Sequence, residues 1–338
     1  MPRLPYVTLD VFTSTPLSAG NPLAIVSIPP SVTLTKLQEH QITKEFNYSE
    51  TVFIYPPSPS ISAHLTKIAI WTPTQELPFA GHPTVGTGWY LSTLADTDAR
   101  YAADEFKLLA PAGILSISKG EGGKTRVDTP HKVTVWESTI PTSRIAEVVN
   151  LPLSFYEHDH NKIFAKGVTG SGVPAVSIVD GLTFALIEVG SPSVLRGLKA
   201  GSKGVVLDIV KDVGGTVGAG GRSFIGCYCY FVVGSGVEGA TGKVEVRTRM
   251  FFDGDMEDPA TGSAACALAS YLAITRGGDE RGVDEWVVEV TQGVEMGRKS
   301  DIGVTVLLEK AVEGEGRKVS KVLLEGEAVK VMEGVLTI

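Results

Sequence analysis

Residues 76–91 read ELPFAGHPTVGTGWYL and place His82 and a proline directly before a run of small and apolar residues. The pattern returns at residues 257–272, EDPATGSAACALASYL, where Asp258 stands in the place of His82. The two ionisable residues lie 176 positions apart in a chain of 338 residues. A duplicated domain explains this repeat more simply than two coincidences, so the sequence predicts two similar domains related by a pseudo-twofold axis.

Each copy of the repeat predicts the start of a helix. Proline suits the first helical position, because its φ is fixed and the missing amide donor would be unpaired there anyway, so His82 and Asp258 are expected at the N-caps. The residues that follow are apolar nearly all round, above all from Ala264 to Ile274, which predicts helices buried on every side.

The start of a buried helix favours an anion. About four backbone donors are unpaired there, and the helix dipole adds roughly half a positive charge. Two such helix ends meeting between the domains would bind a substrate carboxylate, flanked by His82 and Asp258. An aspartate before proline is also a common N-cap, but a histidine is a poorer one, so the pair favours a site over capping alone. The small and hydroxyl residues expected to line it are Gly86, Thr87, Gly262 and Ser263.

The rest of the chain alternates strands and turns. Strands are expected at residues 6–12, 23–28, 51–55 and 66–71. A short helix is expected to start at the capping-box pair Thr35 and Gln38 and to end near residues 45–47. A hairpin follows at about residues 114–130. We therefore place one domain at 1–130, to which a tail of about 325–338 can return, and the second at 131–324.

Composition narrows the function classes. Thirty basic and 38 acidic residues give a net charge of −8 without a basic stripe, which excludes nucleic acid and membrane surfaces as expected partners. The longest apolar stretch falls short of the roughly 20 residues that span a bilayer, and the first residues lack a secretory apolar region, so a cytoplasmic protein is expected. Three cysteines without a C-x-x-C pair predict neither a disulfide framework nor a zinc site, and they are expected to be packing residues.

Five stretches resemble one known family. GNPLAIV, SETVFI, ELPFAGHPTVGT, EDPATGSAA and QGVEMGR follow one another from residue 20 to residue 298. In this order they are similar to the motifs of the phenazine-biosynthesis isomerase (PhzF-like) family.

The resemblance implies an α+β, diaminopimelate epimerase-like fold. Each of its two domains wraps a barrel-like, mostly antiparallel sheet around a central helix, with the active site between them. It also implies a homodimer and isomerisation by proton transfer without a cofactor or metal, as in the dihydro-hydroxyanthranilate isomerase of phenazine biosynthesis.

By the same resemblance, the acid/base glutamate precedes the SET motif and is assigned to Glu45. Near a helix C-terminus, the dipole and partial burial would raise the pKa of that carboxyl, as a group that gives and takes a proton requires. His82 and Asp258 then contact substrate or relay protons. The residues expected to bind the substrate are Gly81, Gly86, Thr87, Thr261, Gly262 and Ser263.

Other interpretations stay open. The chain could be a binding or scaffold protein that keeps the fold without catalysis, or an epimerase or lyase of an amino or hydroxy acid. A racemase with two catalytic thiols is disfavoured, because neither helix entrance carries a cysteine. The sequence GSGVEG at residues 234–239 favours a hairpin turn over a dinucleotide site, and HDH at residues 158–160 favours a loop over a metal site.

Overall fold

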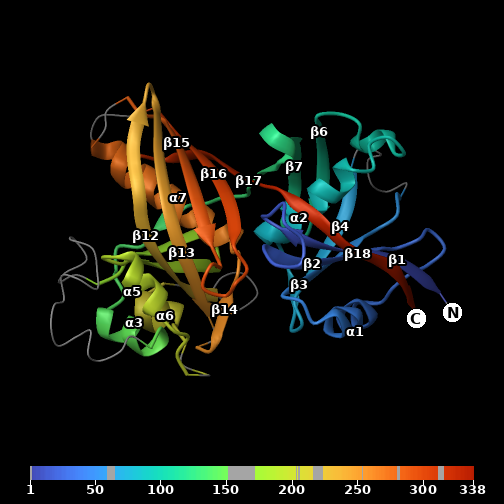
Figure 1. Ribbon diagram of the computed structural model, residues 1–338, viewed down its shortest axis with the longest axis horizontal. Helices are drawn as coiled ribbons and strands as arrows, with labels where there is room; N and C mark the ends of the chain where they lie inside the picture. Colours follow the sequence, from blue (N-terminus) through green and yellow to red (C-terminus); the bar gives the residue numbers. More distant parts are fainter. Residues whose placement is uncertain are drawn as a thin grey trace. The chain divides into compact units, whose positions relative to one another are not determined.

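The computed structural model describes residues 2–58, 65–150, 172–202, 204, 206–215, 224–252, 254–279, 282–310 and 316–338. The chain forms two compact units, shown in Figure 1. Unit 1 comprises Met1–Pro130, Gly297–Asp301 and Leu323–Ile338, and unit 2 comprises His131–Met296 and Ile302–Val322. The HDH stretch lies outside the described residues.

Unit 1 is built on one continuous series of paired strands. Their order is β18-β1-β2-β3-β4-β6-β7-β8-β17, with β5 on the end of β4. Only β2/β3 and β4/β6 are parallel pairs in this series. The strands are β1 (Arg3–Val11), β2 (Asn21–Ser27), β3 (Glu50–Ile54), β4 (Leu65–Trp71), β5 (Glu76–Leu77), β6 (Glu105–Ala110), β7 (Gly113–Lys119), β8 (Thr125–Asp128), β17 (Val319–Gly326) and β18 (Ala328–Thr337).

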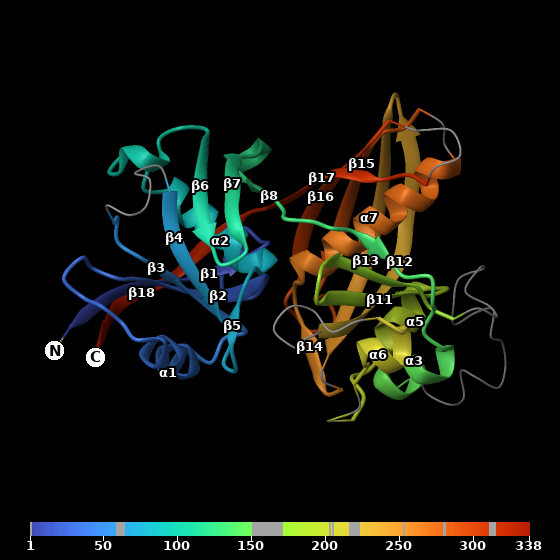
Figure 2. The same cartoon turned by 180° about the vertical axis from the view of Figure 1, so that it is seen from behind.

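Two helices interrupt these strands. α1 (Lys36–Phe46) begins with the predicted capping box of Thr35 and Gln38, and ends at Asn47, which adopts the left-handed conformation. α2 (Gly81–Ser92) packs against β1, β2, β3, β8 and β18, so strands of the sheet enclose it (Figure 2). Short 3₁₀ turns follow at η1 (Ala99–Tyr101) and η2 (Glu121–Gly123).

Unit 2 has its own series of strands, in the order β9-β10-β11-β12-β13-β15, with β14 on the end of β13. The strands are β9 (Thr134–Val135), β10 (Ala175–Val179), β11 (Leu182–Glu188), β12 (Phe224–Glu238), β13 (Thr241–Phe252), β14 (Met256–Asp258), β15 (Glu285–Gln292) and β16 (Ser300–Leu308). The helices are α3 (Thr142–Val148), α5 (Pro192–Gly197), α6 (Ile209–Val213) and α7 (Gly262–Asp279). The predicted hairpin is confirmed, but its turn lies at Gly239 and Ala240, because Gly234 to Glu238 belong to β12 and pair antiparallel with β13.

The strand pairings follow the same order in both units. In unit 1 an antiparallel pair (β1/β2) is followed by a helical crossover to a parallel partner (β3), an antiparallel hairpin (β3/β4), a short strand (β5), a buried helix and a parallel return (β6). In unit 2, β10 to β15 repeat this sequence of steps with α5 and α6 in the crossover and α7 as the buried helix. In nearly all proteins the crossover between two parallel strands of one sheet is right-handed. This rule leaves few topologies for a given order of pairings, so the shared order is specific.

Both repeat helices are buried, as predicted. Eight consecutive residues of α2, from Gly81 to Gly88, are buried, and the side chains from Ala264 to Ala269 in α7 are fully enclosed. α7 packs against β10, β11 and β15. Since neither helix has a polar face to turn toward solvent, each becomes the centre of its own unit.

The predicted N-caps are wrong in both copies. The Thr84 amide donates to the Ala80 carbonyl (3.3 Å), so α2 is capped at Ala80 and His82 is its second residue. The Ala265 amide donates to the Thr261 carbonyl (3.0 Å), so α7 starts three residues beyond Pro259. A proline within the first turn costs no helical hydrogen bond, because those amides have no partner in the helix, and α2 can therefore start two residues before Pro83.

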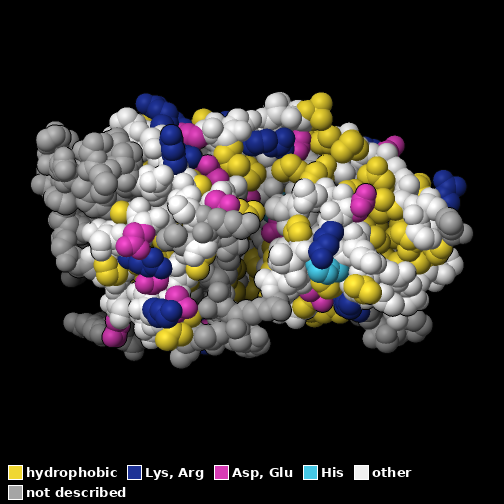
Figure 3. All heavy atoms as spheres, turned by 90° about the horizontal axis from the view of Figure 1, so that it is seen from below, with side chains coloured by type: hydrophobic (Ala, Val, Ile, Leu, Met, Phe, Trp, Pro, Cys, Tyr) yellow, Lys and Arg dark blue, Asp and Glu magenta, His cyan; other side chains and the backbone are white. Residues whose placement is uncertain are grey.

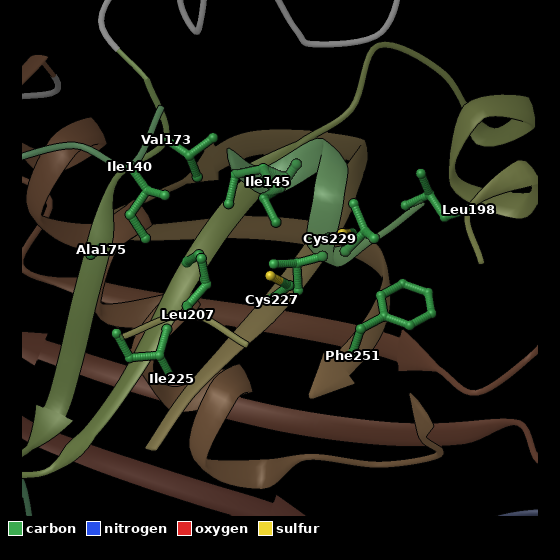
Figure 4. Close-up of a cluster of buried hydrophobic side chains, with 14 of the residues drawn as sticks. Ile140, Ile145, Val173, Ala175, Leu198, Leu207, Ile225, Cys227, Cys229 and Phe251 are labelled. Carbon is green, nitrogen blue, oxygen red and sulfur yellow. The ribbon is translucent and has the colours of Figure 1, made fainter. Parts of the chain in front are cut away.

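Unit 2 has an apolar cluster formed by residues of its short helices and of the strands that they pack against (Figure 4). Ile140, Leu198 and Phe251 belong to it, together with Cys227 and Cys229 from β12. Burial raises the pKa of the Cys227 thiol to about 12 and that of Cys229 well above its usual value. These cysteines are therefore packing residues, as the sequence predicted.

The surface charge and the helices bear on the classes of partner that the sequence predicts. On the face drawn in Figure 3, basic and acidic side chains are interspersed among uncharged atoms. Of the helices in the described part of the chain, none has the length and apolar character to cross a bilayer.

Candidate functional site

The first turn of α2 carries the first ionisable residue of the repeat. His82 is only 4% exposed, and its neighbours Gly81 and Pro83 are also buried. The Thr84 hydroxyl donates to the Ala80 carbonyl (2.8 Å), which uses that side chain within the helix. The imidazole is therefore held at a buried helix start, where the dipole is positive.

A glutamate from the neighbouring strand faces this imidazole. Glu50 is the first residue of β3, and its Oε2 lies 3.6 Å from His82 Nε2. The Glu50 side chain is 16% exposed and that of His82 is 5% exposed. Among the described residues, Oε2 has no hydrogen-bond partner, so a buried carboxyl oxygen is left with a histidine ring as its polar neighbour.

Asn21 fixes the other side of the ring. The Ser49 hydroxyl donates to Asn21 Oδ1 (3.3 Å), which leaves the Asn21 amide group to face His82 Nδ1 at 3.5 Å. An NH₂ group can only donate, so Nδ1 accepts and the proton of the neutral ring is on Nε2. This tautomer directs the imidazole N–H toward Glu50.

Burial determines the proton affinity of Glu50. Loss of solvation raises the pKa of its carboxyl to about 7, and the neighbouring Ser49 side chain opposes this only in part. A carboxyl with this pKa is present in both protonation states at neutral pH. It can therefore take a proton from one atom and return it to another.

The expected partial burial of Glu45 is wrong. Glu45 is the next-to-last residue of α1, and its side chain is exposed. The buried acid of this helix is instead Glu39, which accepts from Trp71 Nε1 (2.9 Å) and Lys36 Nζ (3.1 Å). The period of α1 turns Glu39 and Thr43 inward and Glu45 outward, and the assignment from position alone did not include this period.

Gly86 and Thr87 lie two residues further into α2 than predicted, because the helix is capped at Ala80 and not at His82. A Cβ on Gly86 would stand 2.6 Å from Leu23 Cδ2 and 2.7 Å from Val11 Cγ2. Glycine at this position therefore lets α2 approach β1 and β2 closely, and Thr87 beside it is fully buried. Both residues therefore contribute to the packing of α2, whose first residue is Gly81.

Unit 2 carries the second ionisable residue at the end of β14. Asp258 is half-buried, and its Oδ2 accepts a hydrogen bond of 2.5 Å from the Thr261 hydroxyl. Gly262 and Ser263 form the first turn of α7, as predicted, and both are buried. Asp258 therefore precedes the buried helix of unit 2, whereas His82 is part of the buried helix of unit 1.

Two further motif residues hold loops in place. Arg298 donates to Asp10 Oδ1 (2.5 Å) and to the Gly20 carbonyl (2.9 Å), which ties down the turn before Asn21. Glu76 pairs with Lys36 at 2.8 Å.

The sequence reasoning missed Glu50, Asn21 and Ser49. All three occur within quoted motifs, GNPLAIV and SETVFI. The available signal was a charged and an amide residue at the first positions of two adjacent parallel strands, where their side chains reach the same end of the sheet.

The two α+β units share one topology, each built on a buried helix with an ionisable residue near its start, and this fold occurs in solved structures of other proteins. A predicted epimerase of Pseudomonas aeruginosa shares the fold with a TM-score of 0.63, 24% identity and 99% coverage of both chains. A PhzF-family phenazine biosynthesis protein of Bacillus anthracis shares it with a TM-score of 0.71, 22% identity and 100% coverage of both chains.

Sequence comparison then gives the family. The model of the phenazine biosynthesis-like (PhzC-PhzF) proteins matches residues 9–334, and the chain belongs to that family. The trans-2,3-dihydro-3-hydroxyanthranilate isomerase of Pseudomonas aeruginosa is 27% identical over 334 residues, which is 97% of this chain and 98% of that protein.

Proposed function

We propose that this protein is an isomerase that moves a proton, and with it a double bond, within a small carboxylate-bearing metabolite, without a cofactor. The observation that carries the proposal is the buried Glu50 carboxyl, whose pKa is raised to about 7 beside His82. Its relatives include proteins named isomerases, which agrees with this reaction class.

Glu50 is the proposed acid and base, in place of Glu45. Its carboxylate takes a proton from a carbon that is acidified by an adjacent double bond. The electron pair left behind shifts the double bond, and the neutral carboxyl then returns the proton to the far carbon of the system. Atoms and charge balance without an oxidant or reductant. The His82 Nε2–H stabilises the carboxylate form of Glu50 before the substrate binds.

The remaining predicted residues keep supporting roles in this proposal. Asp258 is a second acid/base or substrate-contacting group for the same reaction. Backbone donors in the first turns of α2 and α7 suit a substrate carboxylate, because each turn lies at the positive end of a buried helix. The residues proposed to contact it are Gly81, Thr261, Gly262 and Ser263.

The proposed substrate class is an unsaturated, ring-bearing carboxylic acid, in line with the substrate named for the relatives. The first compound to test is therefore trans-2,3-dihydro-3-hydroxyanthranilate. The first experiment follows deuterium from D₂O into a panel of such acids by NMR. It compares the wild type with Glu50→Gln and, as a matched control on the same segment, Glu45→Gln.

We expect exchange in the wild type and in Glu45→Gln, and a loss of at least about 10²-fold in Glu50→Gln, the lower range for removing a general acid/base. Loss in Glu45→Gln alone would return the role to Glu45. A folded wild type that exchanges none of the panel but binds a member of it would favour the binding-protein alternative. A product that has lost a group, or has inverted at one carbon, would favour the lyase or epimerase alternative.

A further inference from the structure

The Asp258 turn of unit 2 rests on a buried hydrogen-bond network centred on Gln292. Gln292 is the last residue of β15 and is fully buried, on the strand face that also carries Trp286, Val288 and Val290. An amide at a position where the alternation calls for an apolar side chain must be hydrogen-bonded to be tolerated.

All four hydrogen-bonding positions of this amide are used. Gln292 Nε2 donates to the Asp258 carbonyl (2.8 Å) and to Thr261 Oγ1 (3.1 Å). Gln292 Oε1 accepts from the Thr261 amide (3.2 Å) and from the Tyr228 hydroxyl (3.0 Å). A backbone N–H can only donate and a backbone carbonyl can only accept, so the orientation of the side-chain amide is fixed.

This orientation sets the direction of every hydroxyl around it. Because Thr261 Oγ1 accepts from Gln292, its own proton goes to Asp258 Oδ2 at 2.5 Å. Tyr228 donates to Gln292 and accepts from Thr248 Oγ1 at 3.0 Å, and both residues are buried. The chain of donors therefore ends on the Asp258 carboxylate, which must act there as an acceptor.

A second contact holds β14, the strand that ends at Asp258, through its residue Glu257. Arg249 donates to both carboxylate oxygens of Glu257, at 2.7 and 2.8 Å, and to the Leu198 carbonyl at 2.6 Å. Glu257 immediately precedes Asp258 in β14, and Arg249 is 6% exposed. A buried bidentate pair of this kind fixes both position and angle.

We infer that Gln292, supported by Tyr228, is a positioning residue that holds Asp258 and Thr261 in register and presents Asp258 as a hydrogen-bond acceptor. The expected effect on turnover rests on the proposed function, whereas the positioning of Asp258 does not depend on it. Small displacements of a reacting group cost up to about 10²-fold in rate, so loss of the network is expected to affect turnover.

The test uses two variants and a matched control. Gln292→Met keeps the length of the side chain and removes its four hydrogen bonds, and Tyr228→Phe removes one of these together with the bond from Thr248. Tyr230→Phe is the control, because Tyr230 lies two residues along the same strand, is equally buried, and donates to Glu188 (3.1 Å) outside the network. Urea unfolding of each variant shows whether it is folded under the assay conditions.

The first readout needs no substrate. Aspartate is labelled with ¹³C at the carboxyl carbon, and the Asp258 resonance is assigned by its absence in Asp258→Asn. We expect this resonance to shift in Gln292→Met and Tyr228→Phe and to stay in place in Tyr230→Phe. An unchanged resonance in folded Gln292→Met overturns the inference, whatever the protein catalyses.

The second readout is the deuterium exchange assay. We expect a fall of about 10- to 100-fold in kcat for Gln292→Met, a smaller fall for Tyr228→Phe, and a change within about 2-fold for Tyr230→Phe. Wild-type turnover in folded Gln292→Met overturns the positioning role and leaves the proposed function standing. If the wild type itself exchanges nothing, the proposed function fails and the ¹³C comparison alone decides the inference.

Discussion

Glu50 Oε2 and His82 Nε2 lie 3.6 Å apart in unit 1, on side chains that are 16% and 5% exposed. The first comes from the start of a strand and the second from the first turn of a buried helix. The pair joins a carboxyl whose pKa is raised by burial to a ring whose tautomer is fixed by Asn21. The first two predictions depend on this relationship.

The rate of deuterium exchange should follow the ionisation of Glu50. Only the carboxylate can take the first proton, so kcat/KM should rise tenfold per pH unit below about pH 7 and level off above it. The profile is measured between pH 5 and 9 on a substrate that does not itself titrate in this range. An inflection near the ordinary glutamate value of 4.5 would argue against Glu50 as the base.

The stability of the protein should fall as Glu50 ionises. Its pKa is about 7 when folded against 4.5 in the reference state, so the folded protein binds more protons between these values. Stability is then greatest below pH 4.5 and declines as pH rises through 7, by about 3 kcal/mol if no other group compensates. His82 faces Glu50 and offsets part of this when it is protonated.

Urea unfolding at pH 5 and pH 8 measures the effect, with Glu50→Gln as the comparison. Glutamine resembles the neutral carboxyl, so the variant should gain stability relative to the wild type as pH rises. Equal pH dependence in the two proteins would show that Glu50 titrates normally.

Substitution of Gly86 should destabilise unit 1. A Cβ there would meet Leu23 and Val11 side chains at 2.6 and 2.7 Å, and such overpacking costs about 1–3 kcal/mol. Gly86→Ala is compared with Gly197→Ala, where an added Cβ has no described atom within 4 Å. Urea unfolding should show a loss of stability only in the first variant. Equal stabilities would mean that α2 does not pack this closely.

Removal of Arg298 should leave Asp10 buried without its partner. Asp10 is 3% exposed and also accepts from the Leu17 amide (2.7 Å). We expect Arg298→Met to lower the free energy of unfolding by about 3 kcal/mol. Lys299→Met, which removes an exposed pair with Asp301, should change it by less than about 0.5 kcal/mol. Similar losses in both variants would refute the special role of Arg298.

The cysteines should be unreactive in the folded protein. All three are buried, and burial raises the pKa of Cys227 and Cys229. A chromogenic disulfide reagent should therefore label none before denaturation and all three in guanidinium chloride. Rapid labelling of the folded protein, with loss of exchange activity, would revive a thiol mechanism.

The homodimer implied by the family resemblance stays a prediction, and light scattering of the purified protein tests it.

Particular residues show how far the sequence could lead. The repeat around His82 and Asp258 predicted two similar units, and the strand pairings of the two units match. Thr35 and Gln38 predicted the start of α1 correctly, because a capping box is a local interaction. Glu45 was chosen by its distance from a motif along the chain, and that distance does not say which face of α1 a residue occupies.

The sequence by itself determined the duplication, the two buried helices and the family, because periodicity, local capping and motif order are written along the chain. Only the tertiary structure decided which carboxyl is buried against His82, and that Gln292 holds the Asp258 turn. Burial, and with it the pKa of Glu50, depends on strands and helices brought together from distant parts of the chain. No pattern within one segment records which groups from other segments will exclude water from it.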